Sequence, residues 1–141
     1  MSPEQLALVR STHDLVGPRL DRLVVEVRVV VAASHPELGP AMPFDPAGAE
    51  PGSVGTVNDL VARVSDLPSF RDRAAAAGRA HRLEGISARH YQVFFPQLGE
   101  AMAIELSTDW TDAVAASWRL LFALMTQSML DGARRSAAGA N

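Results

Sequence analysis

The residues best suited to chemistry lie close together, between positions 80 and 91. His81 ends a helical segment rich in alanine and arginine, a short Gly85-Ile86-Ser87 connection follows, and Tyr91 stands near the start of the next helical segment. An imidazole is a good ligand for iron, but it needs a second polar group to hold the ring and dry, apolar surroundings. A histidine held near a tyrosine between two apolar helices therefore suits a haem iron.

The other three histidines are weaker candidates for a metal ligand. His90 neighbours Tyr91 on the same predicted helix, where successive side chains point about 100° apart. His35 precedes a proline at a predicted helix start, where a structural role is expected, and His13 is expected on a helix surface. The sequence has no Ser/His/Asp set, phosphate loop, paired-carboxylate site or EF-hand spacing, so a hydrolase or a nucleotide enzyme has no support.

Composition limits the class of protein further. A chain of 141 residues is expected to form one domain, and the absence of cysteine excludes disulfides and thiolate metal sites. The net charge of −3 gives no basic field for nucleic acid. The apolar runs look too short to cross a membrane, and no signal peptide is recognisable. A cytoplasmic protein is therefore expected.

Apolar residues recur at helical spacing along most of the chain and predict an all-α protein. Ser2 is expected to cap a first helix that ends at Gly17, and Pro18 to begin a second. Residues 24–31 include a β-branched run that favours a strand locally, but no hairpin partner or turn signal lies nearby. We interpret this run as part of the second helix.

Five further helical segments are expected, which makes about seven in all. His35-Pro36 begins a short one, and residues 39–55 then hold four prolines and four glycines, which argue against a regular helix. Helical periodicity resumes near residue 54, and Leu67-Pro68 breaks it before the segment 70–83.

The last two segments have their own start signals. Ser87 is expected to cap a long helix, and Thr108 or Asp109 the final one. Residues beyond Gly132 read as a frayed polar tail. We assign one domain to residues 1–134 and a flexible tail to residues 135–141.

Four landmarks carry a resemblance to a known family. They are the ten-residue step from His81 to Tyr91, Leu67-Pro68 upstream, Trp118 downstream, and His35-Pro36-Glu37-Leu38 near the end of the second helix. In this order and spacing the chain resembles the bacterial single-domain haemoglobins and the globin half of flavohaemoglobins, over roughly its whole length. The resemblance implies a globin-like fold around a haem pocket, haem b as cofactor and His81 as the iron ligand.

The resemblance also implies which residues contact the haem. Phe44 is expected against the haem face; strict spacing would choose Met42 for that place, but residue type favours Phe44. Arg79 and Arg82 could pair with the haem propionates, or could be solvated charges at a helix end. The full set of expected contacts is Phe44, Val54, Val57, Arg79, Arg82, Ile86, Tyr91, Phe94 and Phe122.

Three positions depart from the family pattern. Arg28 stands where many relatives carry a tyrosine that hydrogen-bonds bound oxygen, and Ala49 stands at about the distal glutamine or histidine. We expect Arg28 to face solvent and oxygen to bind weakly; turned inward, its guanidinium could act on a bound anion or a polarised diatomic molecule. Ala133 replaces the glutamate that polarises the tyrosine in relatives, and Asp131 is shorter and out of phase, so strong peroxidase chemistry is not expected.

The expected function is reversible binding of a diatomic gas (oxygen, nitric oxide or carbon monoxide) at a histidine-ligated haem iron. One alternative is a haem-free globin-fold module for sensing or protein interaction, motivated by the irregular distal segment. Another is a nitric-oxide dioxygenase, for which we expect a separate reductase as the electron donor. The expected partners are the gas and at most an external reductase, with no nucleic acid and no membrane. Oligomeric state is left open.

Overall fold

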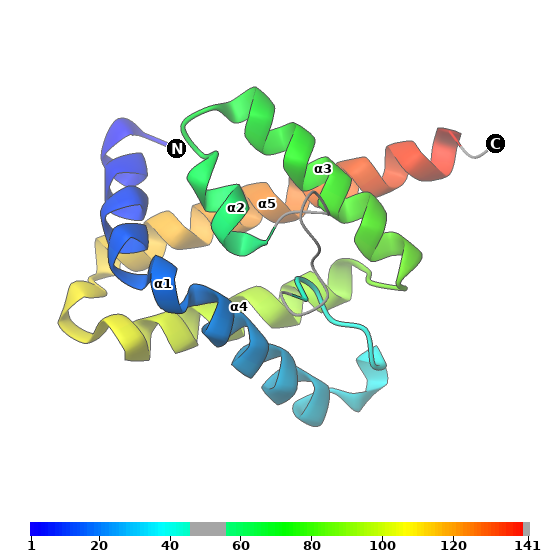
Figure 1. Ribbon diagram of the computed structural model, residues 1–141, viewed down its shortest axis with the longest axis horizontal. Coiled ribbons are helices and arrows are strands. Elements are labelled where there is room, and N and C mark those ends of the chain that lie inside the picture. The colour runs from blue at the N-terminus through cyan, green and yellow to red at the C-terminus, as the bar shows by residue number, and fades with distance from the viewer. Residues whose placement is uncertain (46–55, 140–141) are drawn as a thin grey trace.

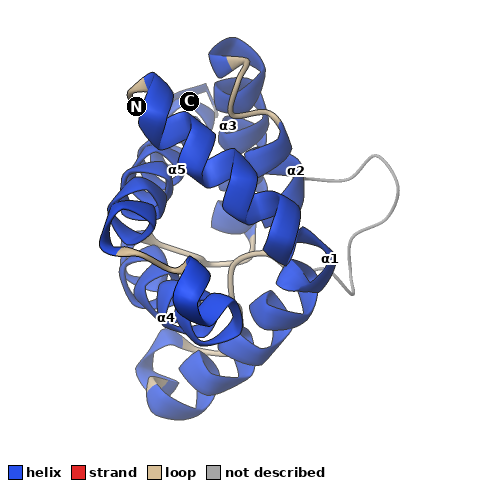
Figure 2. Cartoon of the chain, turned by 90° about the vertical axis from the view of Figure 1, so that its left-hand side faces the viewer, coloured by secondary structure: helices blue, strands red, loops and turns tan. Residues whose placement is uncertain are grey.

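The computed structural model describes residues 1–45 and 56–139, with side chains described as far as Arg135. Within these residues every regular element is a helix (Figure 2). The order is α1 (Pro3–Ser34), the 3₁₀ turn η1 (Pro36–Leu38), α2 (Val57–Ala62), α3 (Leu67–Leu83), α4 (Ala88–Leu106), the 3₁₀ turn η3 (Ser107–Asp109) and α5 (Asp112–Gly139). The helices cross at large angles around a common core (Figure 1), which confirms the predicted all-α globin-like architecture.

The first two predicted helices are one continuous helix, α1, so the predicted end at Gly17 is wrong. Ser2 caps α1 in the expected capping box with Gln5, and Pro18 lies inside the helix. Proline there removes one backbone hydrogen bond and bends a helix without always ending it, and α1 changes direction along its length in Figure 1. The amide of Asn58 donates to the carbonyl of Gly17 at 3.1 Å, which stabilises the bend from α2.

The middle helices begin at side-chain caps. Thr56 caps the short helix α2, which is shorter than the periodicity over residues 54–64 suggests. Asp66 caps α3 with Pro68 in its first turn, so Leu67-Pro68 opens this helix instead of preceding it. Ser87 caps α4 as predicted.

The final helix differs from its prediction at both ends. Thr108 and Asp109 lie in η3, and the hydroxyl of Thr111 accepts from the backbone N–H of Val114 at the start of α5. At the other end α5 continues to Gly139, so the predicted tail is helical over residues 135–139. This last part of α5 contains several alanines, which have the highest helix propensity. Their propensity outweighs the absence of an apolar stripe.

Two glycines bring α3 and α5 into close contact. A methyl group at Gly78 of α3 would overlap the backbone of Met129, and one at Gly132 of α5 would overlap the backbone of Ala75. Ala74 and Ala77 are also fully buried on α3. This face of small side chains lets the two backbones approach closely and fixes the direction in which the end of α3 points.

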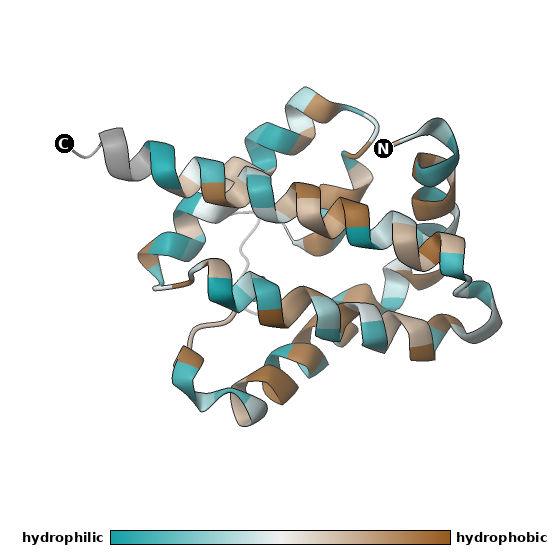
Figure 3. Ribbon diagram, turned by 180° about the vertical axis from the view of Figure 1, so that it is seen from behind, coloured by the Kyte–Doolittle hydropathy of each residue, from teal (hydrophilic) through white to brown (hydrophobic). Residues whose placement is uncertain are grey.

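Hydrophobic faces turned inward complete the core, while hydrophilic and hydrophobic residues mix on the outer surfaces seen in Figure 3. On α5, 24 residues (Asp112–Arg135) are long and apolar enough to cross a membrane by length and composition, which corrects the expectation that no segment reaches that threshold. However, 44% of that window is buried inside the protein, because Trp118, Met125 and Met129 pack in the core. The apolar character of α5 is therefore explained by its packing.

Candidate functional site

His81 lies in the last turn of α3, and the turn that ends this helix holds its backbone. Ile86 N–H donates to the carbonyl of His81 and Gly85 N–H to that of Arg82, both at 3.0 Å. With Gly85 at φ +87°, these bonds form a Schellman cap. His81 follows Gly78 by one helical turn, so the α3–α5 contact directs its side chain into the core, where it is only 6% exposed.

Both ring nitrogens of His81 have partners. Nδ1 lies 2.8 Å from the hydroxyl of Tyr91 on α4, and Nε2 accepts from the backbone N–H of Phe44 at 3.3 Å. Because Nε2 accepts, it carries no proton, so the neutral ring has its proton on Nδ1 and donates it to Tyr91. The structure thus fixes both the tautomer and the direction of the Nε2 lone pair.

Burial lowers the pKa of His81 to about 4, and the positive charge of Arg28 acts in the same direction. The imidazole is therefore neutral at pH 7, which is the form that binds a metal ion. Burial also raises the pKa of Tyr91, so its hydroxyl keeps its proton.

Phe44 covers the Nε2 side of His81. Its ring meets the imidazole edge-on, with centroids 5.0 Å apart, and is 3% exposed. Phe44 has φ +59°, a left-handed conformation that costs a residue with a Cβ about 1–2 kcal/mol. Met42, the other candidate for this place, is equally buried, but its side chain has no aromatic ring to pack against the imidazole.

Aromatic rings connect this cluster to the rest of the core. Phe44 contacts Phe94 and Phe95 with centroids 5.9 Å from each, and Phe95 stacks on Phe122 at 4.7 Å. Offset and edge-on contacts of this kind add to the energy of burial. His81 is thus enclosed by apolar rings on the side facing the core.

Arg28 of α1 points inward, contrary to the prediction that it faces solvent. Its guanidinium contacts Asp45 at 3.2 Å and the carbonyl of Met42 at 3.4 Å, and its side chain is 22% exposed. Its Nε is buried without a hydrogen-bond partner among the described residues. The sequence held no signal that residues 42–45 would contact Arg28.

Two of the other histidines, His90 and His13, have structural contacts, whereas Nδ1 of His35 is buried without a hydrogen-bond partner among the described residues. Nε2 of His90 donates to the carbonyl of Leu38 at 2.9 Å, and its Nδ1 accepts from Ser87 N–H at 3.0 Å within the cap of α4. His90 therefore has no free lone pair. His13 pairs with Asn58 at 2.8 Å, so this expected surface residue is half-buried.

The structure brings only some of the predicted haem contacts together. Ile86, Phe94 and Val57 are buried in the core, and Phe44 and Tyr91 touch His81 directly. Arg79 and Arg82 are exposed near the end of α3 and make no ion pair within the described chain. Val54 and Ala49 lie outside the described residues.

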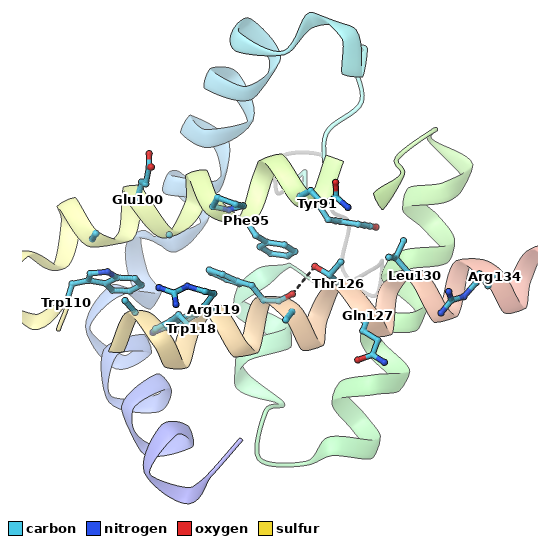
Figure 4. Close-up of a pocket in the computed structure, with 17 residues that line it drawn as sticks. Tyr91, Phe95, Glu100, Trp110, Trp118, Arg119, Thr126, Gln127, Leu130 and Arg134 are labelled. Carbon is cyan, nitrogen blue, oxygen red and sulfur yellow. Dashed lines mark hydrogen bonds between the residues drawn. The ribbon is translucent and has the colours of Figure 1, made fainter. Parts of the chain in front are cut away.

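A cavity of about 910 Å³ lies between α4 and α5 (Figure 4). Tyr91 and Phe122, both predicted to contact a haem, line it, whereas His81, Ile86 and Phe44 do not. Figure 4 shows Tyr91 and Phe95 entering it from α4, and Thr126 and Leu130 from α5. The cavity is thus separate from the space in front of Nε2.

Among known protein families, the globin family model matches residues 53–129, more than half of the chain. The chain belongs to the globin family. The matched region contains His81, Tyr91 and Trp118, whereas Arg28 and Phe44 precede it. No curated protein matches this globin.

The chemistry of the residues around His81 fits the proximal side of a haem, the group that globins generally bind. A neutral imidazole with a fixed tautomer lies among apolar rings, and a haem iron needs only one such ligand from the protein. One contact must change, because a metal–imidazole bond is about 2 Å long and Phe44 N–H now occupies that direction. Within the described residues no cluster of three or more metal-binding side chains offers another site.

Proposed function

We propose that this globin binds haem b through Nε2 of His81 and reversibly binds a diatomic gas. The observation that supports the proposal is the hydrogen bond of 2.8 Å between Nδ1 of His81 and Tyr91. This bond leaves the lone pair of Nε2 directed toward the backbone N–H of Phe44, which comes from residues 42–45. A haem iron held there supplies one open coordination position for oxygen, nitric oxide or carbon monoxide.

The surrounding residues have distinct roles in this proposal. Phe94 and Ile86 exclude water on the proximal side, and Phe44 and Val57 supply further apolar contacts. Arg79 and Arg82 are exposed near the end of the helix that carries His81, where they can pair with propionates without being desolvated.

The hydroxyl of Tyr91 orients the imidazole but gains no charge from a carboxylate among the described side chains. Asp131, the nearest acidic candidate on α5, pairs with Arg134 instead. The imidazole therefore stays a nearly neutral donor, and we expect low peroxide turnover. Binding is accordingly favoured over catalysis, and nitric-oxide dioxygenation with an external reductase stays the enzymatic alternative.

Haem titration of the purified protein tests the proposal. We expect the wild type to develop a Soret band with one haem per chain, and His81→Ala to lose it because the proposed iron ligand is removed. His90→Ala is the control, since both nitrogens of His90 are already bonded elsewhere. A native histidine-ligated spectrum in His81→Ala would refute the assignment.

A haem-free sensory or interaction module is the second candidate, and the contacts that residues 42–45 make with His81 favour it. Phe44 N–H already satisfies Nε2, and Met42 and Phe44 are buried to 3% exposure, so the described chain is compact without a cofactor. A wild-type protein that is helical and cooperatively folded but develops no Soret band at micromolar haem would decide for this candidate.

A further inference from the structure

Arg28 is tied to both ends of the short segment that covers His81. Its Nη2 donates to the carbonyl of Met42 and its Nη1 pairs with Asp45, so one guanidinium spans the two residues that flank Pro43-Phe44. A planar guanidinium presents its donors in a fixed fork, so it can hold two such contacts in one geometry, whereas the donors of an ammonium group rotate on a flexible stem. The segment Met42–Asp45 is called the cover below.

The backbone conformation of the cover is unfavourable at Phe44 and must be stabilised by surrounding contacts. Phe44 has positive φ, which is unfavourable for a residue with a Cβ and persists only where surrounding contacts impose it. This conformation turns the N–H of Phe44 toward Nε2 of His81 at 3.3 Å. Relaxation of Phe44 to negative φ would change the path of the chain through the cover, and loss of this hydrogen bond would uncover the lone pair of Nε2.

We propose that Arg28 is a positioning residue that holds the cover on Nε2 of His81 and so slows the access of haem to its ligand. The inference rests on the proposed function, because it concerns when His81 becomes available. Phe44 N–H and an iron compete for one lone pair, so haem enters only after the cover opens. Arg28 stabilises the covered state through two contacts that an open cover would lose.

The test compares four full-length proteins: wild type, Arg28→Leu, Arg28→Lys and the control Arg22→Leu. Arg22 is on the same helix but 59% exposed, and it pairs with Glu26 and Glu105 away from the cover. Two quantities are measured: hydrogen exchange of the Phe44 amide by NMR in haem-free protein, and the rate of haem uptake by stopped-flow absorption.

In Arg28→Leu we expect Phe44 amide exchange and haem uptake each to rise about threefold to tenfold, which is the effect of losing one or two modest hydrogen bonds. Arg28→Lys should lie between wild type and Arg28→Leu, because it keeps the positive charge but lacks the fixed fork of donors. Arg22→Leu should match wild type. A merely structural role would instead speed exchange at amides throughout α1.

Unchanged Phe44 exchange in Arg28→Leu, or uptake no faster than in wild type while the other variants load haem, would overturn the proposal. Faster Phe44 exchange with no haem uptake in any protein would support the role of Arg28 on the cover and refute haem binding. The failure of the inference and the failure of the proposed function therefore give different results.

Discussion

The two nitrogens of His81 meet two different kinds of structure. On the Nδ1 side, a tyrosine side chain from the helix α4 lies 2.8 Å away, in a framework where α3 packs tightly on α5. On the Nε2 side, a backbone N–H comes from the irregular cover, in which Phe44 has positive φ. Regular helices therefore position Tyr91, whereas Phe44 lies in an irregular segment whose conformation depends on the residues packed around it.

This difference separates what is rigid in the site from what can change. Removing the hydroxyl of Tyr91 would leave α4 where it is, because many buried side chains fix that helix. The cover belongs to no helix and is held by side-chain contacts, among them those of Arg28 and of the buried ring of Phe44. Irregular segments open at lower free-energy cost than core helices, so exchange of partners is expected on the Nε2 side.

The largest effect is expected from breaking the framework itself. Gly78→Ala places a methyl group into the backbone of Met129, so α3 must shift from α5, and we expect a loss of about 3 kcal/mol in the free energy of unfolding. Gly99→Ala is the matched control, because a methyl group there meets nothing within 4 Å. It should stabilise α4 by about 0.5–1 kcal/mol. Denaturant unfolding measures both, and equal effects would contradict the close α3–α5 contact.

Tyr91→Phe tests the helix-borne partner of His81. The buried Nδ1–H would lose its acceptor, so we expect a loss of about 2 kcal/mol in the free energy of unfolding of the haem-free protein. Thr126→Val removes a hydroxyl that bonds only to the carbonyl of Phe122 in its own helix, and it should cost far less. If the two variants lose equal stability in chemical denaturation, the His81–Tyr91 bond does not contribute as described.

Gly85→Ala tests the Schellman cap that holds the backbone of His81. At φ +87° an added Cβ is strained, so we expect a loss of about 1 kcal/mol even though nothing crowds the site. Gly85→Asn should lose less, since asparagine tolerates left-handed conformations. Thermal unfolding of the two variants measures the difference, and an Asn variant less stable than the Ala variant would argue against this origin.

The smallest effect is expected at Asp59, which ties α2 to the framework. Burial alone would raise the pKa of Asp59, but hydrogen bonds from Arg73 and Arg63 outweigh it and lower the pKa. A lowered pKa means that the folded state favours the charged carboxylate. Its contribution is complete above the ordinary pKa of about 3.9 and is lost as the pH falls through the folded value.

Asp59→Asn should therefore cost about 0.5 kcal/mol at pH 7, because these ion pairs are partly exposed. The difference from wild type should shrink as the pH is lowered below about 4. Asp14→Asn, at an exposed residue of α1, serves as control. A difference between Asp59→Asn and wild type that grows in acid would contradict the sign of the pKa shift.

Much of the fold could be predicted because it follows from local patterns. The apolar stripe of α4, its Ser87 cap and the Gly85 turn are all readable in sequence, and each forms as predicted. The errors lie where local signals conflict with packing. Pro18 predicts a helix start, yet α1 continues through it, because Asn58 and the core stabilise the bend.

The candidate site divides in the same way. The pairing of His81 with Tyr91 could be predicted because one helix end, one tight turn and one helix start separate them. The inward direction of Arg28 could not, because it depends on residues 42–45, which have no regular structure to constrain them. Phe122, expected near the haem, lines the α4–α5 cavity together with Tyr91, and helix periodicity does not predict this cavity.

By itself the sequence determined that this protein is helical and that Tyr91 lies near His81. These features depend on helix periodicity and on the turn between two consecutive helices, where contacts are close in sequence. Only the tertiary structure decided what lies on the other side of the His81 ring. The contacts from Arg28 to Asp45 and from Phe44 to His81 join residues 17 and 37 positions apart. Such contacts depend on backbone strain, burial and charge in the folded molecule, and the local sequence pattern does not predict them.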